Sequence, residues 1–447
     1  MTTHPADALS ALVTRQRTAP VDEESARRLA ANGLELSLVT TDDERDAWVQ
    51  SVARGFLDTE RDAGQLAAVR ERSTYRRAVG VYDPSAPEPA APVGSVAGWV
   101  TDLTVPGGAT LPTLAVSAVT VAATHHRRGI ARALVEGELR TAAALGVPLA
   151  SLTVSESQLY GRYGFGAAVP VTSWRIDNRR AGWIGPEPGG RVDFVSRERF
   201  RELAPALHER VRPRVVGEVP VPAGQWDSFA GTRPDAKEAG KNRAVQYTDA
   251  AGEVRGLLVY GVEENPVDYP RSTATVSLLL AENPDAHAAL WRFVLGLDLI
   301  GEVRASELSV DEPLRWMIAD QRAAHVEVVD HHYVRILDVS AALEARRYGA
   351  PGVLALDVTD PLGITGGRWL LDVDDDGRGV VEAWPDGAAA PAGATTVELG
   401  VTELAIAYLG GVSLATLVAA GRATTSDPAH AARVLGWHEA PRLSFWY

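Results

Sequence analysis

Residues 119–134 read VTVAATHHRRGIARAL, a β-branched strand that passes through a basic, glycine-containing turn into an apolar-periodic helix. The first N–H groups of a helix lack partners within it, and the helix dipole places partial positive charge at the same end. Gly129 and the small Ala131 let the backbone approach a ligand closely. The turn therefore suits a pyrophosphate. A basic helix N-terminus on a charged loop is the alternative interpretation.

The sequence around this turn alternates between strands and helices. Strands are expected at residues 34–39, 77–82, 94–103, 111–122 and 150–154. Turn residues separate the middle three, which indicates an antiparallel meander. Thr41, followed by three acidic residues, predicts the start of a helix through Trp48. These elements describe a mixed α/β domain.

Two further mixed regions follow this domain. Strand-like residues 274–280 precede Asn283-Pro284-Asp285, which opens a helix, so the strand-to-helix passage is repeated without an Arg/Gly phosphate loop. The last region begins with a strand at 334–339 and carries a helix near 404–409. The predicted organisation is a peripheral extension at 1–32 and domains at 33–176, 177–330 and 331–447.

Composition limits what the chain can do. Lys+Arg 44 against Asp+Glu 58 gives 44 − 58 = −14, an acidic balance that repels nucleic acid and anionic lipid and attracts cationic molecules. The absence of cysteine excludes disulfides and a thiol nucleophile. Residues 1–40 lack an apolar targeting segment, and no apolar run reaches the ~20 residues of a membrane span. We therefore expect a soluble, cytoplasmic protein that binds neither nucleic acid nor membrane.

A second segment, residues 152–166, reads LTVSESQLYGRYGFG, a strand followed by a tyrosine- and glycine-rich turn. Together the two segments resemble the GNAT acetyltransferases, with His126 where that family carries Arg or Gln. Nearly all of the chain after residue 32 resembles the enhanced intracellular survival (Eis) family. This resemblance implies an α/β (α+β) fold class, with two GNAT-like domains, the second degenerate, and a sterol carrier protein-like α+β C-terminal domain. It also implies a homohexamer.

The resemblance further implies which residues form the site. Acetyl-CoA would be the co-substrate, and no metal is expected. The cofactor-binding residues would be Val119, Thr120, Val121, Arg127, Arg128, Gly129, Ile130, Ala131, Arg132, Ser155 and Glu156. Tyr160 would be the general acid, and the C-terminal carboxylate of Tyr447 the general base. Asp58 and Trp446 would face the substrate, although Asp58 is equally well interpreted as a surface aspartate at a helix end.

These roles are chemically consistent. A terminal carboxylate has a reference pKa of about 3.5 and an alkylammonium about 10.4, so the carboxylate is ionised and can accept the amine proton. The neutral amine would attack the thioester directly, since the chain has no cysteine for an acyl-enzyme. The substrate would be a small cationic amine, such as an aminoglycoside or polyamine, or a lysine-bearing protein. A non-catalytic acyl-CoA sensor or lipid-binding protein is the alternative.

Three other patterns favour structural roles. Residues 372–377 resemble half of a calcium loop, but the required acid would fall at Ala383, so a hairpin turn is expected. The histidines His325, His331 and His332 are expected on a strand surface rather than around a metal. Tyr163 and Phe165 are expected to pack in the core.

Overall fold

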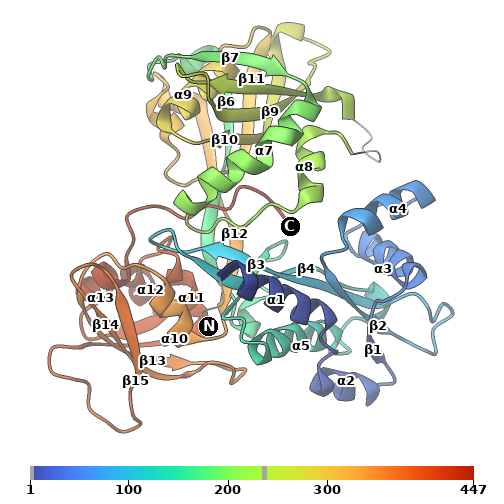
Figure 1. The fold of residues 1–447 in the computed structure, drawn as a ribbon, viewed down its shortest axis with the longest axis vertical. Coiled ribbons are helices and arrows are strands. Elements are labelled where there is room, and N and C mark those ends of the chain that lie inside the picture. The colour runs from blue at the N-terminus through green and yellow to red at the C-terminus, as the bar shows by residue number, and fades with distance from the viewer. Residues whose placement is uncertain (1–4, 234–238) are drawn as a thin grey trace. The chain divides into compact units, whose positions relative to one another are not determined.

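A computed structural model describes residues 5–233 and 239–447, which form two compact units (Figure 1). The first unit contains residues up to 169, residues 332–439 and Tyr447. The second contains residues 170–331 and 440–446. The units divide at 169/170 inside strand β6 (Gly166–Asp177) and at 331/332 inside strand β12 (Ala324–Ile336), so each of these strands contributes to both units. The predicted domain limits at 176/177 and 330/331 fall inside the same two strands.

The first unit is built on a mixed sheet. Its strands follow the order β1-β2-β3-β4-β5, and residues 332–336 of β12 pair antiparallel with β5. The pairings from β1 to β4 are antiparallel, which confirms the predicted meander, whereas β5 runs parallel to β4. The strands are β1 (Glu35–Leu38), β2 (Arg77–Tyr82), β3 (Gly94–Thr104), β4 (Thr110–Val121) and β5 (Leu149–Thr153).

Helices cover both faces of this sheet. Neighbouring strand residues point to opposite faces, and Val96 packs in the core cluster that contains residues of α5 (Ile130–Ala144), whereas Ala97 packs with α3 (Asp42–Gly55). The helix α4 (Ala63–Arg72) lies beside α3 (Figure 1). The parallel β4–α5–β5 crossover therefore has the turn at residues 122–129 at one end of the sheet.

The N-terminal residues do not form a peripheral extension, and that prediction is wrong. The helices α1 (Pro5–Thr18) and α2 (Glu23–Ala30) belong to the first unit, and Leu29 is buried in its core. Ser25 Oγ donates to the carbonyl of Ala133 at 2.7 Å, and Arg140 binds Asp22 at 2.7 Å. Polar contacts with α5 therefore attach these two helices to the first unit, although the segment has few apolar residues.

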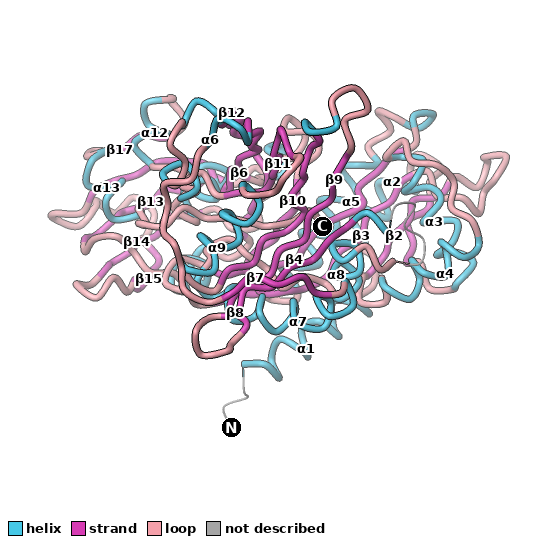
Figure 2. Tube along the Cα trace, turned by 90° about the horizontal axis from the view of Figure 1, so that it is seen from above, coloured by secondary structure: helices cyan, strands magenta, loops and turns pink. Residues whose placement is uncertain are grey.

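The C-terminal part of the first unit is a second sheet, of order β15-β14-β13-β16-β17, in which Figure 2 shows β13, β14 and β15 side by side. The turn at Asp374–Gly377 is the predicted hairpin. The predicted strand at 334–339 ends instead at Ile336, because Asp338 caps the next helix. The elements are α10 (Val339–Ala345), β13 (Gly352–Thr359), β14 (Gly367–Val373), β15 (Gly379–Ala383), β16 (Thr395–Gly400), α11 (Val401–Tyr408), α12 (Leu414–Ala419), β17 (Ala423–Thr425) and α13 (Pro428–Leu435).

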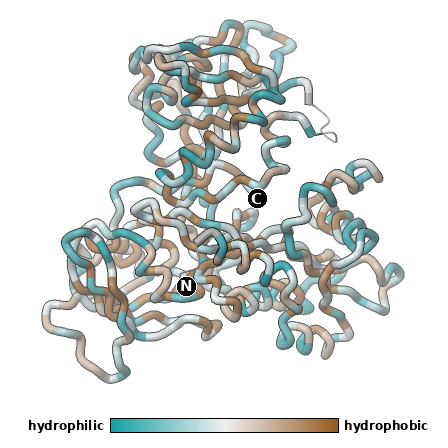
Figure 3. The backbone as a smooth tube through the Cα atoms, viewed as in Figure 1, coloured by the Kyte–Doolittle hydropathy of each residue, from teal (hydrophilic) through white to brown (hydrophobic). Residues whose placement is uncertain are grey.

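The second unit repeats the architecture of the first sheet, with the order β6-β11-β10-β9-β8-β7. A parallel crossover again leads from β10 through α9 to β11, and α7 and α8 pack on the face opposite α9. Apolar residues concentrate along the central strands (Figure 3). The elements are α6 (Asn178–Ala181), β7 (Arg191–Val195), α7 (Arg197–Val211), α8 (Ala223–Ala230), β8 (Asn242–Thr248), β9 (Val254–Glu263), β10 (Ser272–Ala281), α9 (Pro284–Leu295) and β11 (Ile300–Leu308).

Candidate active site

The strands β4 and β5 form a fork. Their parallel pairing covers only Thr113–Ala115 against Leu149–Ser151, although β4 continues to Val121. A bulge marks the separation, because the β3–β4 register shifts there and Ala118 has a φ of 53°. Ser95 Oγ stabilises this bulge by donating to the Ala118 carbonyl at 2.9 Å. Residues Val119–Val121 therefore present backbone groups toward the opening rather than to β5.

The helix α3 packs against β4, one of the two strands of the fork. Gly55 lies against Thr120, and a Cβ at Gly55 would stand 2.5 Å from the Cβ of Thr120. The missing side chain thus permits the close approach of helix and strand. Thr120 Oγ1 also lies 2.7 Å from Ser95 Oγ, so this residue is fixed from two sides.

The helix α5 starts without a side-chain cap. Its N-cap is Gly129, in the left-handed conformation at φ 79°, and Arg127 also has a positive φ of 63°. Alternating backbone conformations of this kind turn successive N–H groups toward one point, a concavity that binds anions. The first N–H groups of α5 thus have no competing side chain, and the helix dipole favours negative charge there.

The arginines of this loop differ in what they can do. Arg127 is exposed, whereas Arg128 binds Asp83 at 3.1 Å and the carbonyl of Asn32 at 3.0 Å. Asp83 also accepts from Ser85 and lies 3.1 Å from His125 Nε2, and these contacts, that to Ser85 foremost, lower the pKa of its carboxyl group. Arg132 pairs with Glu136 at 3.1 Å on α5. Arg127 is therefore the arginine most available to a phosphate, and Arg128 holds the loop in place.

The other residues predicted to bind the cofactor differ in their exposure to solvent. Ile130 is buried in the core, so it can offer only backbone groups to a ligand, while Ala131 is half-buried. On the other arm, Ser155 and Glu156 lie exposed in the segment that follows β5.

Tyr160 lies just before the short helix η2 (Gly161–Tyr163) and is half-buried. Its ring meets Phe165 edge to face, with the centroids 6.0 Å apart. Burial, with smaller contributions from Tyr163 and Glu156, raises the pKa of the Tyr160 phenol to about 12. The phenol is therefore protonated at neutral pH and can act as a donor. Tyr163 and Phe165 are themselves buried in the core, as predicted.

The turn that carries Tyr160 is supported by the C-terminal part of the first unit. Gly164, at φ 84°, lies against the guanidinium of Arg335, and a Cβ at Gly166 would stand 2.4 Å from the carbonyl of Thr402. Arg335 is fully buried and binds the equally buried Asp360 at 2.7 Å. Any side chain at either glycine would push this support away from the turn.

Tyr447 lies at the base of the fork. Thr153 Oγ1 donates to the main-chain oxygen of Tyr447 at 2.9 Å and lies 3.3 Å from its nitrogen. The phenol oxygen of Tyr447 is 2.8 Å from both Ser151 Oγ and His332 Nε2. Its ring packs edge to face on Trp99, with the centroids 5.3 Å apart. Ser151 belongs to the last β4–β5 pair, so Tyr447 is placed where the strands part.

The two predicted substrate residues lie in different units. Asp58 is exposed in the first unit and binds Arg61 at 2.7 Å. Trp446 lies in the second unit, where its indole N–H donates to Glu307 at 3.1 Å and its ring packs on His331, with the centroids 4.9 Å apart. Each therefore already has a protein partner.

The structure corrects one prediction and adds residues that the sequence did not suggest. His331 and His332 are buried rather than on a strand surface, because the C-terminal residues Phe445 and Tyr447 bind their Nε2 atoms at 3.1 and 2.8 Å. Ser151, Thr153 and His332 around Tyr447 were missed. No local pattern reveals contacts with residues 115 to 296 positions apart in the chain. Within residues 5–233 and 239–447, no group of three potential ligands is arranged to hold a metal ion.

Comparisons with known proteins agree with this geometry. Models described as an acetyltransferase (GNAT) domain match residues 39–168 and 218–336, and a sterol carrier protein domain matches 339–444. An uncharacterized N-acetyltransferase of Streptomyces avermitilis is 38% identical over 84% of this chain and 89% of its own. The N-acetyltransferase Eis of Mycobacterium tuberculosis is 34% identical over 73% of this chain and 77% of its own. The crystal structure of Eis1 from Mycobacterium abscessus superimposes with a TM-score of 0.77 at 25% identity, covering 92% of this chain and 100% of that one.

A forked parallel strand pair with an uncapped helix at its end, in a chain of two GNAT domains, defines a GNAT-type N-acetyltransferase. More narrowly, the chain belongs to the Eis family of N-acetyltransferases, with a sterol carrier protein-like domain after the two GNAT domains. GNAT acetyltransferases use acetyl-CoA. None of the helices in the described part of the chain is long and apolar enough to cross a membrane.

Proposed function

We propose that the enzyme transfers the acetyl group of acetyl-CoA to primary amines of cationic substrates, either aminoglycoside- or polyamine-like molecules or lysine side chains. The observation that carries the proposal is the β4–β5 fork, with the uncapped start of α5 at one end, Tyr447 bound to Ser151 where the strands part, and Tyr160 on the turn that follows β5. The net charge of −14 favours cationic acceptors.

The fork fits the elongated co-substrate in two places. The pyrophosphate would bind the N–H groups of residues 127–132 and the exposed Arg127, a concave, positively polarised site. The pantetheine amides would pair with the backbone of Val119–Val121, which lies beyond the β4–β5 ladder. Ser155 and Glu156 would line the other arm. The acetyl group would then lie near Ser151, where the ladder ends.

In the reaction, the amine nitrogen attacks the thioester carbonyl carbon, and the C–S bond breaks. The ammonium proton passes to the C-terminal carboxylate of Tyr447, directly or through water. A backbone N–H of Val119–Val121 donates to the oxyanion. Tyr160 donates to the departing sulfur. Its pKa of about 12 keeps the phenol protonated at neutral pH, so it carries the proton that the departing sulfur takes up.

Asp58 would orient the substrate amine group in the first unit. Asp58 would have to exchange Arg61 for the substrate, because the two side chains form an ion pair. A homohexamer is the assembly we expect, and light scattering after size exclusion tests it.

Thiol release from acetyl-CoA tests the activity, with an aminoglycoside, a polyamine and a lysine peptide as acceptors. Release that depends on the amine supports the transferase and ranks the acceptors. Acetyl-CoA binding without release with any of the three contradicts this substrate class.

A single glycine added after Tyr447 tests the base. It replaces the carboxylate at that position by an amide, so kcat should fall by about 10²-fold or more, the usual size of a general-base contribution. The Kd of acetyl-CoA should stay nearly unchanged. A glycine inserted in the exposed turn at Gly387 is the control for chain length. Unchanged kcat in the extended protein would remove the carboxylate from the mechanism.

A further inference from the structure

The phenol of Tyr447 is bound at the fork by groups from two strands. Its oxygen lies 2.8 Å from Ser151 Oγ on β5 and 2.8 Å from His332 Nε2 on β12. Both partners are fully buried. A carboxylate base needs none of these contacts, since only the main chain of the last residue carries the carboxylate. The side chain of Tyr447 therefore has a role separate from that of the carboxylate.

The strand registers place the partners of Tyr447 on one face of the sheet. Trp99 on β3 pairs with Ala115, Ala115 pairs with Ser151, and Thr153 pairs with His332. Paired residues share a face, as do residues two apart on one strand. Three strands thus present Trp99, Ser151, Thr153 and His332 to the same side, where Tyr447 packs on all four.

The hydrogen bonds form a continuous chain. Thr113 Oγ1 donates to Ser151 Oγ at 3.2 Å. The Tyr447 phenol oxygen lies 2.8 Å from both Ser151 Oγ and His332 Nε2, and either atom of each pair can be the donor. Burial raises the pKa of the Tyr447 phenol, which keeps its proton in place. The phenol is therefore held by hydrogen bonds from two sides.

We infer that His332 is a positioning residue for the reaction: its Nε2 is hydrogen-bonded to the Tyr447 phenol, and together with Ser151 and Thr153 it fixes the last residue in one orientation at the fork. The inference rests on the proposed role of Tyr447 as the base. Thr153 restrains the main chain and His332 restrains the ring, so the direction of the carboxylate is set by contacts at both ends of the residue. Misplacement of a reacting group by about 1 Å can lower a rate 10²-fold.

Two substitutions at His332 separate positioning from packing. His332→Leu removes the hydrogen-bonding group, whereas His332→Gln keeps a polar amide near the position of Nε2. We expect His332→Leu to lower kcat about tenfold, with the Kd of acetyl-CoA and the KM of the amine within about twofold, and His332→Gln to restore most of the loss. His325→Leu, at an exposed position on the same strand, should leave kcat unchanged. Equal kcat in His332→Leu and wild type would overturn the inference, as would an equal loss in both His332 variants.

A double substitution shows whether the effect passes through the phenol. Tyr447→Phe keeps the ring and the carboxylate but removes the hydroxyl group. If His332 acts through that hydroxyl, adding His332→Leu to Tyr447→Phe should cause no further loss of kcat. If the losses of kcat in the two single variants multiply in the double variant, His332 acts by another route and the inference is wrong. Circular dichroism and thermal melting identify any variant that fails to fold, and the Gln variant then carries the test.

The glycine extension after Tyr447 distinguishes this failure from failure of the proposed function. A low kcat in the extended protein with normal kcat in His332→Leu leaves the base in place and rejects the positioning role. A normal kcat in the extended protein rejects the carboxylate base itself, and with it the role of His332 in orienting that base.

Discussion

The two GNAT domains contain the same strand–helix–strand crossover but start its helix differently. In the first domain, β4 leads through residues 122–129 to α5, whose N-cap Gly129 makes no side-chain hydrogen bond. In the second, only residues 282–283 separate β10 from α9, and the Asn283 side chain accepts from the N–H of Ala286 at 2.9 Å. Pro284, the next residue, has no N–H at all.

At the start of α9, the N–H group of Ala286 is therefore already bound, and Pro284 has no N–H group to offer. The neighbouring acid Glu282 binds Arg210 and Arg255, each at 3.1 Å, and would repel a phosphate. The strand pairs differ less, since β10 pairs with β11 over Ser272–Val276 and then continues to Ala281 without β11, as β4 continues past β5 to Val121. A capped helix start stabilises a fold, while an uncapped helix start leaves N–H groups for a ligand.

The largest expected effect concerns Tyr160, which has no counterpart in the second domain, because residues 309–323 after β11 contain no tyrosine. Tyr160→Phe should lower kcat by about 10²- to 10⁴-fold through loss of the acid, with the Kd of acetyl-CoA little changed. Thiol-release kinetics and calorimetric binding measure the two quantities. Tyr163→Phe, at a buried packing residue three positions on, is the matched control and should keep kcat within about twofold of wild type. Wild-type kcat in Tyr160→Phe would remove the acid from the mechanism.

The second prediction makes the first helix start resemble the second. Gly129→Asp places a carboxylate where it can cap α5 and repel phosphate, so the Kd of acetyl-CoA should rise about 10- to 100-fold, as expected for lost charge-assisted hydrogen bonds. At saturating acetyl-CoA, kcat should change little. Gly252→Asp is the control, since Gly252 has a similar φ of 86° and equal space for a Cβ. An unchanged Kd in Gly129→Asp would show that the helix start does not bind the pyrophosphate.

The sequence predicted most of the fold where strands are continuous apolar runs. The strands at 77–82, 94–103 and 111–122 agree with β2, β3 and β4 within about a residue. Strands with many polar residues were missed, among them β8 and β11, because pairing with neighbours rather than side-chain pattern holds them in the sheet. The helix α7 runs through Pro205 to Val211, although a proline usually ends a helix.

The residues of the candidate site also fall into two groups: those that a local sequence pattern indicates and those that it does not. The loop at 126–129 and Tyr160 follow local patterns, so the sequence indicated them. The pairing of Arg128 with Asp83 and the contacts of Tyr447 with Ser151 join residues 45 and 296 positions apart, and nothing local encodes such contacts. We expected Arg128 to bind phosphate. Its ion pair with Asp83 leaves its guanidinium less available for that contact.

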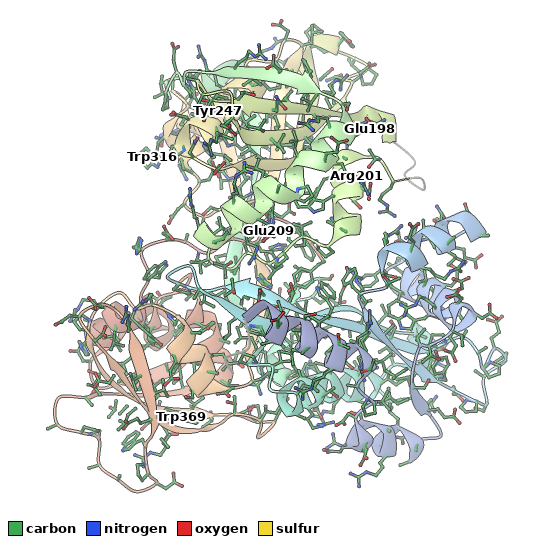
Figure 4. All side chains as sticks on the ribbon, in the orientation of Figure 1. Glu198, Arg201, Glu209, Tyr247, Trp316 and Trp369 are labelled. Carbon is green, nitrogen blue, oxygen red and sulfur yellow. The ribbon has the colours of Figure 1, made fainter. Side chains whose placement is uncertain are left out.

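The smallest expected effect tests whether charges of the second domain serve stability alone. Glu209, on α7 in Figure 4, lies 3.5 Å from His208 and accepts from Arg212 at 2.8 Å, the shorter contact, and the two neighbours lower its pKa to about 2. A lowered pKa means that the carboxylate stabilises the fold above its unfolded value near 4.5 and loses this effect as the pH falls toward 2. Because half of its side chain is exposed, Glu209→Gln should lower the free energy of unfolding at pH 7 by less than ~1 kcal/mol.

Denaturant unfolding at pH 7 and pH 3 measures the difference, which should shrink at the lower pH. Glu202→Gln, exposed on the same helix, is the control. In both variants kcat should equal that of wild type, because the second domain has a capped helix start where the first has its site. A fall in kcat without a fall in stability would mean that α7 contributes to the reaction, and the division between a catalytic and a structural GNAT domain would no longer hold.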